Sequence, residues 1–146
     1  MATFLYDLGR NAFLSASGSG GSGGAIDWLT STIAATLVSS SYTVASGTDQ
    51  FYSIIPTGAI AAPSLVALTS KTAAAGVASC ASIVFTAVTS GFVVNAVVIV
   101  RNTTVAATSN LIAYIDSANA TGLPVTSNGS NITINIDTGA NHLFKL

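Results

Sequence analysis

The chain has 146 residues, of which 50% are apolar and only 6% are charged, and its net charge is −1. Soluble domains usually carry about a quarter charged residues, so we expect much of this surface to be covered by other subunits. The four basic residues are scattered along the chain, which excludes the electrostatic footprint of a nucleic-acid-binding domain. One domain with a single core suits this length.

Composition divides the chain into three segments. Residues 1–15 are predicted to form an N-terminal arm that docks on its own body or on a neighbour, because so short a piece is unstable alone. Residues 16–25 contain only Gly, Ser and Ala and predict a flexible tether with a span of about 17 Å, either a natural insertion or an engineered linker. Residues 26–146 are the predicted body. The arm's apolar residues at helix-like spacing are the candidate partner-binding residues: Phe4, Leu5, Leu8 and Phe13.

Short strand-like segments dominate the body. Residues 26–37 fit either a helix or a strand, and the many Ser and Thr residues favour a strand over 32–38. Further strands are predicted at residues 42–44, 51–55, 65–69, 82–88, 92–101, 110–116, 131–137 and 142–145.

Turn signals between these segments complete the prediction. Asn128-Gly129 is a strong hairpin signal. In the strand that follows, alternation predicts that Ile132, Ile134 and Ile136 face the core. We therefore predict an all-β protein, an antiparallel β-sandwich or a jelly-roll-like barrel with an extended N-terminal arm.

The uncharged stretch over residues 81–100 is long enough to cross a membrane as a helix. Its β-branched content and the Thr89-Ser90-Gly91 break instead predict two buried strands joined by a turn, and hence no membrane contact. Because the second strand is apolar on both faces, another subunit is a candidate for one of its covering layers. Residues 1–13 lack the pattern of a secretory signal, so the Asn-x-Ser/Thr sequences at Asn102, Asn128 and Asn131 are expected to be unmodified.

Residues able to support catalysis are few. His142 is the only histidine and Cys80 the only cysteine. His142 could pair with Asp137 across the last turn to activate a hydroxyl, but no nucleophile motif accompanies them, so a local hydrogen bond is expected. Cys80 lies in an apolar setting and is expected to be an inert, buried thiol.

A calcium site is the remaining chemical hypothesis. Asp116, Asn119 and Thr121 supply oxygen ligands at close spacing, but they lack the further carboxylates and the glycine of a calcium-binding loop. One His and one Cys far apart do not form a transition-metal site. We predict a protein that is not an enzyme, with no catalytic residue, no cofactor and no metal.

The C-terminal sequence LIAYIDSANATGLPVTSNGSNITINIDTGANHLFKL, residues 111–146, resembles the C-terminal block of small tailed-phage virion proteins. The shared pattern is an aliphatic-Tyr-Ile-Asp run, then Thr-Gly-Leu-Pro-Val, Asn-Gly, Gly-Ala-Asn and Phe-Lys-Leu. Residues 68–88 and the N-terminal FLYDLGRNAFL and AIDWLTSTIAATLV are also similar to that family. The chain departs from the family at the Gly/Ser stretch, and at Ala34 and Ala35, where such proteins carry charged residues.

The resemblance implies a structural protein of a phage particle, assembled in the host cytoplasm. The expected role is a head decoration (cement) protein that binds the major capsid protein or other virion subunits and bridges them. A homo-oligomer is expected, with a trimer favoured, because linked weak contacts gain avidity. The alternatives are a neck, tail or fibre component, or a sugar-binding adhesion domain. In a sugar-binding adhesion domain, the candidate rings for stacking on a sugar would be Trp28, Tyr42, Phe51, Tyr52 and Tyr114.

Overall fold

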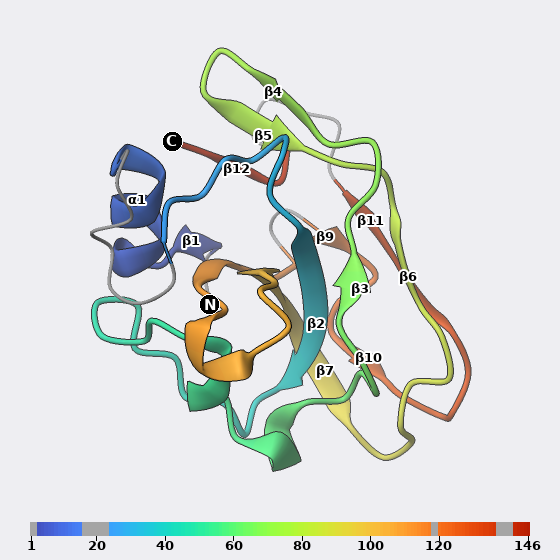
Figure 1. Ribbon diagram of the computed structural model, residues 1–146. Coiled ribbons are helices and arrows are strands. Elements are labelled where there is room, and N and C mark those ends of the chain that lie inside the picture. Colours follow the sequence, from blue (N-terminus) through green and yellow to red (C-terminus); the bar gives the residue numbers. More distant parts are fainter. Residues whose placement is uncertain (1–2, 16–23, 118–119, 137–141) are drawn as a thin grey trace.

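Antiparallel sheets make up most of the computed structural model, which describes residues 3–15, 24–117, 120–136 and 142–146 (Figure 1). The largest sheet has the strand order β1-β8-β7-β2-β3, with β10 also paired to β7. Its strands are β1 (Phe4–Leu5), β2 (Ile33–Ser39), β3 (Val66–Ala67), β7 (Val93–Arg101), β8 (Leu111–Ile115) and β10 (Val125–Thr126).

Two three-stranded sheets accompany it, and the predicted all-β antiparallel sandwich is confirmed. One sheet has the order β6-β11-β9, from β6 (Ile83–Phe85), β11 (Ile132–Ile136) and β9 (Ala120–Thr121). The other has the order β12-β5-β4, from β12 (Phe144–Lys145), β5 (Val77–Ser79) and β4 (Thr72–Ala74). The helical elements described are α1 (Asp7–Leu14) and the 3-10 turns η1 (Tyr52–Ile54), η2 (Thr57–Ala59) and η3 (Ala106–Thr108).

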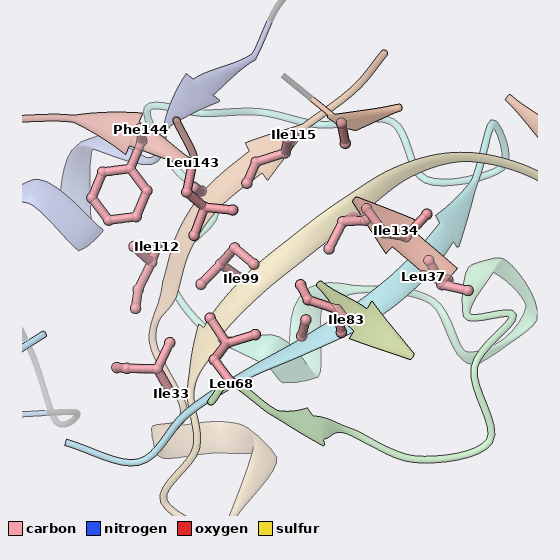
Figure 2. Packing of buried hydrophobic residues seen from close by; sticks show 14 of the residues in the cluster. Ile33, Leu37, Leu68, Ile83, Ile99, Ile112, Ile115, Ile134, Leu143 and Phe144 are labelled. Atoms are coloured by element: carbon pink, nitrogen blue, oxygen red, sulfur yellow. The ribbon is translucent and has the colours of Figure 1, made fainter. Parts of the chain in front are cut away.

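The main core lies between the large sheet and β6 and β11. In Figure 2, Ile99 of β7 and Leu37 of β2 lie in one cluster with Ile83 and Ile134 of the smaller sheet. Ile134 is fully buried, and Ile132 and Ile136 are partly buried against the same cluster, as the alternation predicted. Burying one such isoleucine stabilises the fold by about 1.5–3 kcal/mol.

The chain itself covers the other face of the large sheet. Val98 and Val100 of β7 pack with Tyr42, Ile55 and other side chains from the segment between β2 and β3. The idea that another subunit supplies this layer is therefore wrong for β7. Strand β6 differs from β7, because its central Val84 is 45% exposed and only one of its faces is buried.

The strands predicted at residues 42–44 and 51–55 do not form. The first segment lies in a loop and the second is largely η1, with only an isolated bridge at Phe51. In the loop, the Asp49 carboxylate accepts hydrogen bonds from the Ala45 amide at 2.9 Å and the Tyr42 hydroxyl at 2.7 Å. Side-chain hydrogen bonds of this kind compete with a strand ladder for the backbone donors.

The predicted hairpin at Asn128-Gly129 is also wrong. Strand β10 before the turn pairs with β7, whereas β11 after it pairs with β6, so the turn carries the chain from one sheet to another. Ser127 anchors this crossing by accepting a hydrogen bond from the Phe92 amide at 3.0 Å. A hairpin that was not predicted joins β4 to β5 through Ala75 and Gly76, both at positive φ, as a two-residue type I′ turn requires.

Residues 3–15 are docked on the body, so the structure does not show an extended arm. Strand β1 pairs with β8 and forms the edge of the large sheet, and α1 packs on β8 immediately afterwards. The close approach depends on Gly9, because a Cβ there would collide with the Leu111 carbonyl oxygen and lie 3.1 Å from the Ile112 Cα. Residues 16–23 of the predicted tether lie outside the described residues.

Candidate partner-binding groove

A groove of about 550 Å³ lies where the N-terminal segment meets the C-terminal strand. It is lined by Thr3, Phe4, Leu5, Asp7, Arg10, Ser46, Phe144 and Lys145. Four elements build it: β1, the start of α1, the loop around Ser46, and β12. Both ends of the described chain therefore contribute to one surface feature.

Hydrogen bonds hold the N-terminal wall of this groove in place. The Tyr6 amide donates to the Ile112 carbonyl at 3.0 Å, and the Asp7 amide donates to the Ser46 carbonyl at 3.0 Å. The Tyr6 side chain is fully buried, with its hydroxyl 3.0 Å from the Tyr42 hydroxyl. Burial is the main cause that raises the pKa of both phenols above their ordinary value, so both stay neutral at physiological pH.

The groove holds charges of both signs. Asp7 and Arg10 form an exposed ion pair on the first turns of α1, with each side chain 52% exposed. Lys145 of β12 also lines the groove and is exposed. Exposed pairs of this kind contribute at most about 1 kcal/mol of stability, so these side chains are available for contacts with a partner.

The four candidate partner-binding residues make intramolecular contacts as well. Phe4 and Leu5 line the groove, and the Phe4 ring stacks on Tyr114 at 5.2 Å between centroids. Phe13 packs its ring against Phe144 at 6.1 Å, and Leu8 is half-buried. Only Phe4 and Leu5 are therefore placed in the groove.

A second surface has a different character. The outward side chains of the β6-β11-β9 sheet and its border, which we call the neutral face, are Ser82, Val84, Thr121, Thr133 and Asn135, all exposed. The Ser82 hydroxyl donates to the Asn135 side-chain oxygen at 2.9 Å across the face. Residues 72–100 and 117–136, which include all three strands, contain no Asp, Glu, Lys or Arg. In the view of Figure 1, β6 and β11 lie on the side of the molecule away from α1.

The residues proposed for chemistry are described only in part. Among the described residues, no group of three or more His, Cys, Asp and Glu side chains could hold a metal ion. Asp116 is buried, and its carboxylate accepts a hydrogen bond from the Thr3 hydroxyl at 3.3 Å. Asn119 of the calcium hypothesis and Asp137, the suggested partner of His142, lie outside the described residues.

Cys80 is half-buried and packs against the main core, rather than being fully enclosed. Burial raises the pKa of its thiol to about 11, so very little reactive thiolate is present near neutral pH. This agrees with the expectation of an unreactive cysteine.

The candidate sugar-stacking rings are mostly inside the protein. Trp28, Tyr42 and Tyr114 are 6%, 3% and 2% exposed, and Trp28 packs edge-on against Phe144 at 5.2 Å. Phe51 and Tyr52 are half-buried. Buried rings leave no open face for a sugar to stack on.

No protein-family model matches this chain, and no curated protein matches it. Within the part of the chain that the structure describes, no helix is long and apolar enough to cross a membrane. The groove and the neutral face are thus the two surface features from which a function can be argued.

Proposed function

We propose that this protein is a non-enzymatic structural subunit of a phage particle, a decoration (cement) protein that stabilises the head by bridging shell subunits. The observation that supports this best is the neutral face, whose exposed side chains are all uncharged. Covering such a face permanently requires no charged group to be desolvated, and desolvating a charged group costs several kcal/mol. We infer that the particle is that of a tailed phage from the resemblance of the sequence to small tailed-phage virion proteins.

Bridging requires at least two contact surfaces on one subunit. The neutral face and the groove lie on different elements, and they differ in chemistry because the groove carries Asp7, Arg10 and Lys145. We assign the neutral face to the shell and the groove to a neighbouring subunit. In a homo-oligomer, with a trimer favoured, several weak contacts made together raise the avidity by about 10² to 10⁴.

Quantitative mass spectrometry of purified virions tests this function. We expect the protein at a fixed, high copy number relative to the major shell protein. Particles that lack it should lose their contents at lower temperature, and added purified protein should restore their resistance. Absence from virions would refute the proposal, and a copy number of a few per particle would instead indicate a neck, tail or fibre component. Specific binding in a glycan panel would indicate an adhesion domain.

A further inference from the structure

Residues 3–15 behave in the structure as a plug set into a socket of the body. The plug contributes strand β1, the buried Tyr6 side chain and helix α1. The socket is formed by β8, the loop around Ser46 and the Phe144 ring. All of these contacts are between residues 3–15 and the body. They would therefore be the same if the two parts belonged to different molecules.

The connection is much longer than docking in the same chain requires. The Ile26 amide donates to the Ala12 carbonyl at 3.0 Å, so the two ends of the intervening segment are adjacent. Most of that segment is the Gly/Ser/Ala stretch 16–25, which could extend by roughly 33 Å. A segment of this length and composition lets the plug reach a socket on a neighbouring molecule.

The socket is specific for this plug. Gly9 is required where α1 crosses Leu111, and Tyr6 supplies the hydroxyl that meets Tyr42. A different peptide with a side chain at the Gly9 position would collide with the β8 backbone. The occupant that fits the socket in an assembly is therefore the same segment from a second copy of this chain.

We propose that residues 3–15 exchange between copies, so that in the oligomer the plug of one copy occupies the socket of another. The contacts are the same in both arrangements, so exchange costs little enthalpy and converts them into links between subunits. Leu14 at the end of α1 is 83% exposed in the single chain, and it would be available to a neighbouring copy. The inference rests on the proposed function only in requiring that copies be linked.

A disulfide trap in the full-length chain tests the exchange. Leu5 of β1 faces Ala113 of β8, and the hydrogen bond between residues 6 and 112 places them in a non-hydrogen-bonded pair, where facing side chains are closest. We would combine Leu5→Cys and Ala113→Cys with Cys80→Ser, concentrate the protein, oxidise it and run non-reducing gels. The matched control is Ala73→Cys with Ala78→Cys, a facing pair within the β4–β5 hairpin that is also non-hydrogen-bonded, because the Ala78 carbonyl accepts its hydrogen bond from the Leu143 amide.

We expect covalent dimers or larger species from the plug pair and only monomers from the hairpin pair. Exclusively intrachain bonds at every concentration would overturn the proposal, whether or not the protein is an oligomer by sedimentation. These outcomes are read without particles, so they are distinguishable from failure of the proposed function.

A second variant covers the case in which the double-cysteine protein misfolds. Gly9→Val should prevent docking, because Gly9 touches the β8 backbone, whereas Gly58→Val is the control, because no atom lies within 4 Å of a Cβ there. Sedimentation should show that Gly9→Val dissociates the oligomer and that Gly58→Val does not. An oligomer that persists in Gly9→Val, with the plug released as judged by protease cleavage within residues 3–15, would overturn the exchange.

Discussion

The hydroxyl of Tyr6 donates its hydrogen bond to the hydroxyl of Tyr42, 3.0 Å away. This direction follows because Tyr42 uses its own proton to bind the Asp49 carboxylate at 2.7 Å. These three hydrogen-bonded side chains join the N-terminal segment to the loop that covers the large sheet. It is a buried polar link that holds residues 3–15 in position, in addition to the hydrogen bond from Thr3 to Asp116.

Removing the two hydroxyls should have unequal effects. Tyr6→Phe removes one neutral hydrogen bond and is expected to lower the free energy of unfolding by about 1 kcal/mol. Tyr42→Phe also deprives the buried Asp49 carboxylate of a donor, and its cost should be about 1.5–3 kcal/mol. Urea unfolding at pH 7 measures both. A larger loss in Tyr6→Phe would contradict the assigned direction of the hydrogen bonds.

Stability should fall in alkaline solution. The pKa values of Tyr6 and Tyr42 are raised in the folded protein, mainly by burial, so these phenols ionise in the unfolded chain first. Their contribution is fully present below pH 10, the ordinary tyrosine value, and is lost as the pH rises above it. Urea unfolding between pH 8 and 11 checks this, and Tyr42→Phe should show a shallower decline. An equally steep decline in that variant would assign the effect to other groups.

Substitution by Asp should be severe at one residue of β11 and nearly neutral at its neighbour. Ile134→Asp places a carboxylate in the main core, where Ile134 is fully buried, and should cost several kcal/mol or prevent folding. Thr133→Asp is the matched control because its side chain is exposed on the neutral face, and it should change stability by less than about 0.5 kcal/mol. Thermal unfolding of both variants measures the two losses of stability. A tolerated Ile134→Asp would mean that the strand register is wrong.

The sequence predicted the elements whose pattern is local. Alternation located β11 and its inward isoleucines, and the Ser and Thr content correctly favoured a strand at β2. It could not predict that Asn128-Gly129 turns between two sheets, because a turn signal specifies the bend and not the partners of the strands on either side. Nor could it predict the groove, because Thr3 and Lys145 are brought together only by the pairing of distant strands.

The loop over residues 42–55 shows why apolar spacing alone failed. Tyr42 and Ile55 are buried, as strand residues would be, but they reach the sheet from a loop and a 3-10 turn. The organising group is Asp49, whose carboxylate takes up the backbone donor of Ala45. The sequence signal for a loop was an Asp next to Ser, Gly and Thr in residues 46–49, and the apolar residues on either side outweighed it.

Cys80 should be alkylated slowly. Its pKa of about 11, compared with the ordinary value of 9.0, means that the thiolate forms about two pH units later than in the unfolded chain. The iodoacetamide reaction rate should therefore rise with a midpoint near pH 11 in the folded protein, provided that the fold persists at that pH. In urea the midpoint should be near 9. A folded-state midpoint at or below 9 would contradict the burial of the thiol.

Charge introduced on the neutral face should weaken particle binding without unfolding the protein. Val84→Lys and Thr133→Lys each place an ammonium group on a surface that we assign to the shell, and burying it should reduce affinity at least tenfold, or by about 1.4 kcal/mol. Thr43→Lys is the control, because Thr43 is exposed in the loop after β2. Co-sedimentation with depleted virions measures the effect. Equal binding by all three variants would exclude the neutral face as the contact.

Thr3 and Lys145 line the same groove, so a protein or epitope fused to either end of the chain would emerge at one place. Such a fusion would crowd Arg10 and Asp7 and leave the β6-β11-β9 sheet clear. A tag at either end is therefore expected to interfere with contacts between copies more than with attachment to a shell. If the shell covers the neutral face, cargo attached this way would point away from the particle, which suits the chain to displaying peptides on a capsid.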